Sequence, residues 1–133
     1  MGVPVISRQA EFDAPAEVVF GVLTDPDRTT RWLPLGMSSE TTTVDQVRVR
    51  AGSRIHEYAV SSVPDQLRLE WRSQDSTGPR GTAWVEDSPA GGCVVHAEVS
   101  LPPDSAQSER AEQLLAESLH HLQRDVSDNF NAG

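Results

Sequence analysis

The sequence predicts an α+β fold in which a curved antiparallel sheet of about six or seven strands closes around a long C-terminal helix. Three observations lead to this prediction. Five segments between residues 41 and 101 alternate apolar and polar side chains with the period of two that is typical of strands. Short connections rich in Gly and Pro separate these segments, which permits hairpins but not crossover helices. Beyond residue 103 the apolar side chains recur at helical spacing.

Size and charge predict one domain, residues 1–133, and narrow the possible partners. A chain of 133 residues has the usual length of a single domain. Eleven basic and twenty acidic residues give a net charge of −9, which repels nucleic acid. No window approaches the roughly 20 apolar residues of a membrane span, and the N-terminus lacks the features of a secretion signal. We expect no nucleic-acid partner, no membrane span and a cytoplasmic location.

The first third of the chain predicts one strand and two short helices. Apolar positions alternate with polar ones over residues 3–12, which favours a strand. Pro15 fits the first turn of a helix that follows, because a missing N–H costs nothing there. Asp25 and Pro26 repeat this start signal for a second short helix that runs towards Trp32. Residues 35–40 are then interpreted as a loop and a candidate lid.

The rest of the chain predicts the meander and the final helix. Leu67, Leu69 and Trp71 share one face of a strand, and Cys93 begins a second apolar row. Asp104 can cap the final helix. The predicted strands cover residues 41–49, 53–62, 66–73, 81–87 and 93–101, and the apolar stripe of the helix consists of Ala111, Leu114, Leu115, Leu119, Leu122 and Val126, with Ser118 inside it.

Known cofactor and catalytic motifs are missing from the sequence. No phosphate-binding or dinucleotide-binding glycine loop follows a predicted strand, and no nucleophile elbow is present, so we expect no cofactor. The lone Cys93 excludes an internal disulfide and is interpreted as a small buried apolar residue. Glu117, His121 and Asp125 lie four residues apart along the final helix and could hold a divalent ion. We favour a solvated helix edge and expect no metal.

The order of these elements resembles the helix-grip fold of the START-like (SRPBCC) superfamily, especially its small polyketide cyclase/dehydrase-like members. The resemblance covers nearly the whole chain and rests on Phe12-x-Ala14-Pro15-x-Glu17-x-x-Phe20, Leu23-Thr24-Asp25-Pro26, Trp32, Gly52-Ser53-Arg54 and the turn from Pro64 to Leu69. It implies a cavity between the sheet and the last helix that holds a lipid, sterol, polyketide, hormone or other apolar molecule. The superfamily has no shared catalytic set, so the resemblance assigns no catalytic residue.

If such a cavity exists, aromatic and aliphatic side chains facing the helix are its candidate lining, although core packing alone also accounts for them. Arg54, His56 and Tyr58 share one face of their strand, and the register of the sheet decides whether this face points inward. Facing inward, these three could act as acid, base or hydrogen-bonding groups on a carbonyl-bearing ligand. The candidate ligand-binding residues are Trp32, Tyr58, Leu69, Trp71, Trp84, Leu115, Ser118, Leu119 and Leu122.

Three functions therefore stay open at the level of the sequence. The first is the binding of a small, largely apolar molecule. The second is a cyclase, dehydratase or isomerase that uses Arg54, His56 or Tyr58 in the same pocket. The third is an interaction or regulatory protein that docks a partner, or dimerises, through residues 32–37. We expect a monomer or a homodimer.

Overall fold

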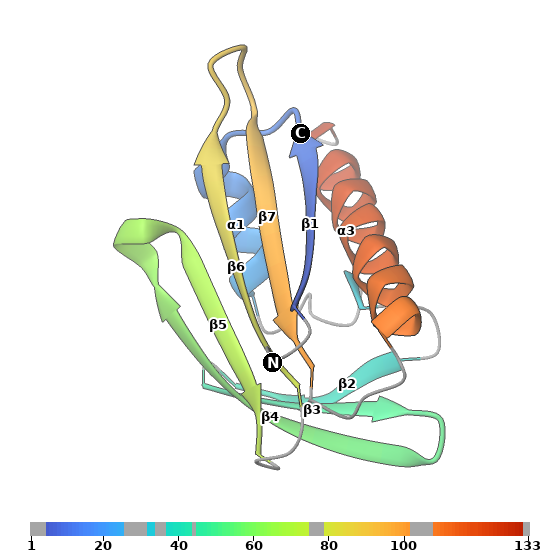
Figure 1. The fold of residues 1–133 in the computed structure, drawn as a ribbon. Helices are drawn as coiled ribbons and strands as arrows, with labels where there is room; N and C mark the ends of the chain where they lie inside the picture. The colour runs from blue at the N-terminus through green and yellow to red at the C-terminus, as the bar shows by residue number, and fades with distance from the viewer. Residues whose placement is uncertain are drawn as a thin grey trace.

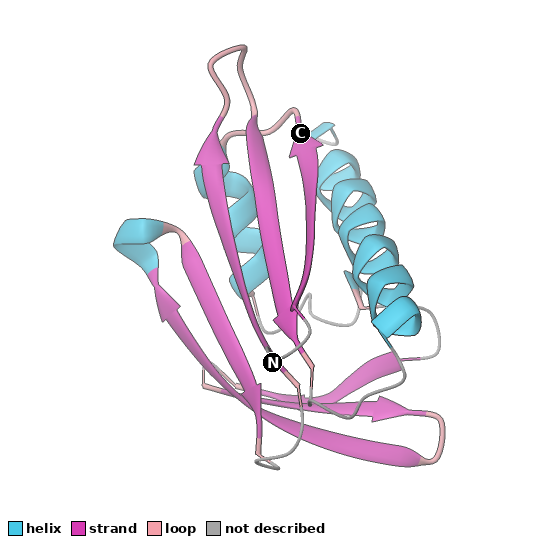
Figure 2. Cartoon of the chain, viewed as in Figure 1, coloured by secondary structure: helices cyan, strands magenta, loops and turns pink. Residues whose placement is uncertain are grey.

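The computed structural model describes residues 5–25, 32–33, 37–43, 45–74, 79–101 and 108–131. It confirms the α+β fold, with a seven-stranded sheet, a short helix after the first strand and a long C-terminal helix (Figures 1 and 2). The elements are β1 (Val5–Phe12), α1 (Ala16–Thr24), β2 (Met37–Thr42), β3 (Gln46–Ala51), β4 (Arg54–Val63), the 3₁₀ turn Pro64–Gln66, β5 (Arg68–Ser73), β6 (Arg80–Asp87), β7 (Cys93–Ser100) and α3 (Ser108–Asn131).

The sheet has the order β1-β7-β6-β5-β4-β3-β2, and every neighbouring pair is antiparallel. Strands β2 to β7 form a meander, and β1 joins it beside β7. In Figure 1, β1, β7 and β6 run upright while β2, β3 and β4 cross below them, so the sheet bends strongly. Helix α3 packs along β1 and also contacts α1, which packs against β6. The two helices therefore cover one face of the upright strands.

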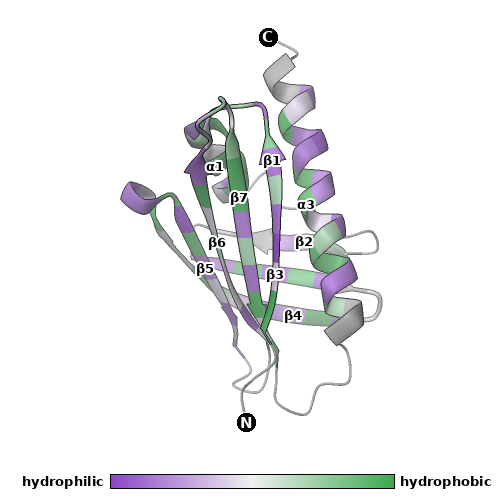
Figure 3. Ribbon diagram, turned by 45° about the horizontal axis from the view of Figure 1, so that its top comes forward, coloured by the Kyte–Doolittle hydropathy of each residue, from purple (hydrophilic) through white to green (hydrophobic). Residues whose placement is uncertain are grey.

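Burial alternates along the strands and defines an inner and an outer face. Leu69 pairs with Ala83, and Val85 pairs with Val95; all four side chains are buried. This side, which α1 and α3 cover, is called the inner face, and residues of the opposite parity form the outer face. Figure 3 shows the alternation of hydrophilic and hydrophobic residues along the same strands.

Cys93 is buried in the core, as the sequence predicts. Burial, and secondarily the charge of Asp87, raises the pKa of its thiol, so the side chain stays protonated and apolar at neutral pH. On α3 the apolar stripe is also confirmed, because Leu119, Leu122 and Val126 are buried in the same core cluster. None of the helices among the described residues is long and apolar enough to cross a membrane.

The prediction of one strand over residues 41–49 is wrong, because a hairpin turn divides this segment. The N–H of Thr43 donates to the carbonyl of Gln46 at 2.8 Å, and the N–H of Gln46 donates to the Thr43 hydroxyl at 3.1 Å. That hydroxyl donates to the carboxylate of Asp45 at 2.9 Å. Thr and Asp side chains thus stabilise a turn without Gly or Pro. The loop predicted for residues 35–40 is corrected as well, because β2 begins at Met37.

Other boundaries shift by one or two residues. Helix α1 begins at Ala16, with Pro15 at the position that caps it. Strand β5 begins at Arg68, because the 3₁₀ turn is followed by Leu67 in a left-handed conformation with φ 48°. The second short helix predicted between Asp25 and Trp32, the candidate lid residue Leu35 and the cap at Asp104 lie outside the described residues, apart from Asp25 and Trp32 themselves.

Candidate functional site

The register of the sheet places Arg54, His56 and Tyr58 on the inner face. Val60 pairs with Trp71 in the row of Leu69, so the even-numbered residues of β4 share the inner face. His56 also pairs with Val49, which is buried. The odd-numbered residues of β4 therefore point outward, where Glu57 forms an ion pair with Arg48 at 2.5 Å. The question that the sequence left open is thereby answered in favour of the polar trio.

Within this trio, the burial of the side chains increases along the strand. Arg54 and His56 are exposed, whereas Tyr58 is partly buried. Burial raises the pKa of the Tyr58 hydroxyl above its ordinary value, so it is protonated at neutral pH. No residue that the structure describes forms a hydrogen bond with it. Tyr58 therefore offers a free donor and acceptor, while His56 and Arg54 lie nearer the solvent end of the same row.

Trp71 lies across the neighbouring strand on the same face. Its cross-strand partner is Gly81, and a Cβ atom built at Gly81 would overlap the indole ring. The ring thus occupies the space that a side chain at position 81 would need. Trp71 packs against the core but stays partly exposed, as do Leu115 of α3 and Trp32. We call these three partly buried side chains, each of which packs against the core, the margin of the core.

Leu69, Leu119 and Leu122 lie deeper than this margin. Their exposed fractions are 7%, 7% and 2%, and all three belong to the main core cluster. The structure therefore brings the predicted aliphatic residues together with Trp32 and Trp71, and it separates a buried layer from a reachable one. Only the reachable layer is available to a bound molecule without repacking of the core.

Trp32 is attached to α3 through its backbone. The Ser118 hydroxyl donates to the carbonyl of Trp32 at 2.6 Å, and Nδ1 of His121 lies 2.9 Å from the carbonyl of Leu33. Since a carbonyl only accepts, Nδ1 of His121 carries the proton in this contact. The indole Nε1 of Trp32 is inaccessible to solvent and has no hydrogen-bond partner among the residues that the structure describes. The sequence analysis selected Ser118 as a lining residue, but it did not predict this contact.

Trp84 lies on the outer face of the sheet, apart from the other residues selected as a candidate lining. It lies between Ala83 and Val85, both buried on the inner face, so alternation directs its ring outward. The ring stacks on His96 with centroids 5.1 Å apart, and the Arg68 guanidinium lies 5.5 Å from its centroid. Its Nε1 donates to Glu86 at 3.2 Å. His96, which pairs with Trp84 on β7, lies on the same outer face.

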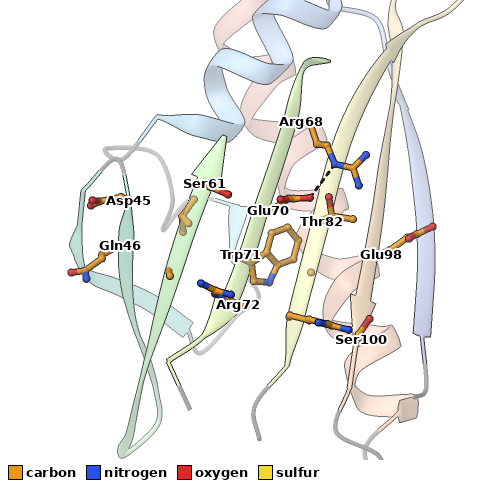
Figure 4. A pocket seen from close by; sticks show the side chains of 14 residues that line it. Asp45, Gln46, Ser61, Arg68, Glu70, Trp71, Arg72, Thr82, Glu98 and Ser100 are labelled. Atoms are coloured by element: carbon orange, nitrogen blue, oxygen red, sulfur yellow. Dashed lines mark hydrogen bonds and ion pairs between the residues drawn. The ribbon is translucent and has the colours of Figure 1, made fainter. Parts of the chain in front are cut away.

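The outer face carries a hollow that the sequence analysis missed. It has a volume of about 770 Å³ and spans β3 to β7 (Figure 4). Charged and hydroxyl side chains dominate its lining, and its Arg72 and Arg80 face each other across the β5–β6 ladder. Alternate polar positions of the two strands were the available signal. Most of the lining residues belong to the outer face, although Val60, Trp71 and Gly81 of the inner face also border the hollow between the strands. The cavity predicted beside α3 therefore stays a prediction. The side chains labelled in Figure 4 are Asp45, Gln46, Ser61, Arg68, Glu70, Trp71, Arg72, Thr82, Glu98 and Ser100.

The acidic and histidine residues of α3 do not form a uniformly solvated edge. Asp125 is 7% exposed, so this part of the prediction is wrong. Nε2 of His121 lies 3.9 Å from the Glu117 carboxylate, and both side chains are partly exposed. Within the part of the chain that the structure describes, no group of three His, Cys, Asp or Glu residues is arranged to hold a metal ion.

Solved structures with the same fold come from several sources. Protein CV1439 from Chromobacterium violaceum superposes with a TM-score of 0.73 at 20% identity, over 92% of this chain and 96% of that one. DynU16, described as a putative protein in the dynemicin biosynthetic locus, gives 0.70 at 18% identity over 94% of this chain and 48% of its own. The di-domain ARO/CYC BexL from the BE-7585A biosynthetic pathway gives 0.74 at 18% identity, over 93% and 46%.

A comparison with curated proteins found no match. In contrast, the sequence model of one family, described as polyketide cyclase / dehydrase and lipid transport, matches residues 4–130. This match spans almost the whole chain and agrees with the helix-grip fold described above. The chain therefore belongs to the polyketide cyclase / dehydrase and lipid transport family.

Proposed function

We propose that the protein binds a small, largely apolar molecule, such as a lipid or a polyketide-like compound, between the inner face of the sheet and α3. The observation that carries this proposal is the margin of the core formed by Trp32, Trp71 and Leu115, which are apolar, adjacent to the core and only partly buried. Removing such surface from water is favourable by roughly 25 cal/mol per Å². An apolar molecule that covers this margin would supply that burial.

Polar groups near this margin suit the orientation of a ligand. The protonated Tyr58 hydroxyl can donate to, or accept from, an oxygen of the bound molecule. Ligand sites in proteins typically combine apolar walls with a few such polar groups. Membership of a family that includes both cyclases or dehydrases and lipid-transport proteins supports the same class of molecule.

A dye-displacement assay tests this proposal. The full chain is stripped of lipid and titrated with anilinonaphthalene sulfonate, and a fatty acid is then added as competitor. We expect saturable dye uptake that the fatty acid reverses. Trp71→Leu should weaken dye binding about tenfold, whereas the matched variant Trp84→Leu on the outer face should leave it unchanged. No displaceable uptake by the unaltered protein would contradict the proposal.

A second candidate function is catalysis of a cyclisation, dehydration or isomerisation between the inner face and α3. The row of Arg54, His56 and Tyr58 on the inner face favours it. General acid–base chemistry requires a titratable group within reach of the substrate, and His56 supplies the imidazole of this row. His56→Ala separates the two functions. A catalyst loses turnover while its ligand affinity survives, whereas a binding protein shows no turnover to lose.

A further inference from the structure

The indole of Trp32 holds a buried hydrogen-bond donor without an acceptor. Its Nε1 has no contact with solvent and no partner among the groups that the structure contains. Buried polar groups in proteins are nearly always paired, because an unpaired one loses its bonds to water without replacement. We therefore expect this nitrogen to donate a hydrogen bond to an acceptor in the functional state of the protein.

Two contacts from α3 fix the backbone that carries this donor. Ser118 and His121 are three residues apart, and residues at this spacing lie on the same side of a helix. They bind the carbonyls of two successive residues, Trp32 and Leu33. Two bonds to successive carbonyls restrict where Trp32 sits relative to the core, so the position of the unpaired N–H is set by the structure.

The surroundings of the ring indicate what kind of acceptor is missing. The cluster against which Trp32 packs consists of aliphatic and aromatic side chains and Cys93. A buried water needs two to four polar partners, whereas an oxygen carried by a ligand needs only this donor. Burying an anion costs much more free energy than burying a neutral acceptor. A neutral oxygen attached to an apolar body meets both conditions.

We infer that Trp32 is a specificity-determining residue whose Nε1–H donates to a neutral acceptor oxygen, such as a carbonyl, on the bound apolar molecule, and that Ser118 and His121 are its positioning residues. This inference rests on the proposed function and deepens it. It makes the ligand an oxygen-bearing apolar compound rather than a plain hydrocarbon.

A pair of probes that differ in one atom group tests the inference. An acetylnaphthalene and the matching isopropenylnaphthalene share one shape, but only the first carries a carbonyl. Their affinities for the delipidated full chain are measured by equilibrium dialysis, and the ratio of the two dissociation constants is compared between variants. Trp32→Phe, which removes the N–H and keeps an aromatic ring, should shift this ratio about fivefold towards the hydrocarbon. Trp84→Phe is the matched control and should not change it.

The outcomes separate this inference from the proposed function. If the unaltered protein binds neither probe, both the proposed function and the inference fail. If it binds both probes and Trp32→Phe leaves the ratio unchanged, the inference fails alone, and a water or another group satisfies the indole. An equal shift in Trp84→Phe also overturns it, because the effect then does not depend on the buried donor.

The roles of Ser118 and His121 are tested by the same ratio of dissociation constants. Ser118→Ala should shift the ratio in the same direction as Trp32→Phe, and Ser118→Thr, which keeps the hydroxyl, should restore it. His121→Ala should act like Ser118→Ala, with the exposed neighbour His120 replaced by Ala as control. A purely structural role would change stability and leave the ratio constant, which would overturn the assignment. These variants also carry the test should Trp32→Phe fail to fold.

Discussion

Trp71 and Trp84 lie on neighbouring strands of one sheet and have opposite surroundings. Trp71, on the inner face, covers Gly81 and packs against the core. Its cross-strand partner on β4 is Val60, two residues after Tyr58 on the same face. Trp84, on the outer face, is flanked by Arg68 and His96. The polar atom of Trp84 is satisfied by Glu86 within the chain.

This difference supports the proposal that the inner face receives the ligand. On the outer face the ring of Trp84 already has partners in its own sheet, His96 and Arg68. On the inner face Tyr58 and Trp32 each keep a polar group for which the described part of the chain supplies no partner. Substitutions on the two faces should therefore have different effects.

Removal of a buried inner-face side chain should cost the most. Leu122 is 2% exposed at the centre of the contact between α3 and the core. Leu122→Ala should lower the free energy of unfolding by about 2–5 kcal/mol, because it removes burial and leaves a cavity. Urea denaturation measures the change. Ile55→Ala on the outer face, where Ile55 is 47% exposed, is the control and should change stability by less than about 0.5 kcal/mol.

One substitution, Gly→Ala, should have opposite signs at two positions. Gly81→Ala forces the new Cβ into the Trp71 ring and should destabilise the protein by about 1–3 kcal/mol. Gly21→Ala in α1 meets no atom within 4 Å and should stabilise it by up to about 1 kcal/mol, because Ala favours a helix over Gly. Thermal unfolding compares the two. Equal effects at both positions would show that Trp71 does not lie over Gly81.

The outer-face stack should contribute to stability without affecting ligand binding. His96→Ala removes the ring that stacks on Trp84, and we expect a loss of about 0.5–1.5 kcal/mol in the free energy of unfolding. Dye affinity, measured by the displacement assay, should stay constant. A loss of dye binding in this variant would place the ligand on the outer face.

Ionisation of Tyr58 should report its burial without any substitution. Tyr58 is the single tyrosine, so ultraviolet absorbance follows its titration directly. Burial favours the neutral phenol, and the folded protein should therefore ionise above the ordinary pKa of about 10. The sign for stability follows from linkage. Folding is unaffected by this group below about pH 10 and is destabilised as the pH rises from there towards the folded pKa, because the unfolded chain releases the proton first.

Tyr58→Phe is the matched variant for this titration. It lacks the ionising group and should lose less stability than the unaltered protein over the same alkaline range. A titration midpoint at or below the ordinary value would mean that the phenol is solvated, and Tyr58 would then lie outside the ligand site.

The fold could be predicted from the sequence because local patterns and global structure agree. Alternation predicted the strands around Leu69 and Val95, and helical spacing predicted the buried stripe of α3. The turn at Thr43 was missed because side-chain hydroxyl and carboxylate bonds form it, without the Gly or Pro that usually indicates a turn. The first part of β2 was taken for a loop because its residues after Met37 are polar and do not alternate with apolar ones.

The site could be predicted only in part. Residue type and predicted cavity selected Trp32, Trp71 and Trp84 together, but alternation between Ala83 and Val85 places Trp84 on the other face. The inward orientation of His56 depended on pairing with β3 and β5, which the sequence of β4 alone does not contain. The contact from Ser118 to Trp32 joins residues 86 positions apart and has no local signal.

The indole N–H signals of the three tryptophans provide the most direct test of the inner face as the ligand site. Each signal is assigned through its Trp→Phe variant in ¹⁵N-labelled, delipidated protein, and the acetylnaphthalene probe is then added stepwise. The account predicts that the signals of Trp32 and Trp71 shift with a common saturation curve while the signal of Trp84 stays in place. A saturable shift of Trp84 alone, or of none of the three, would contradict it.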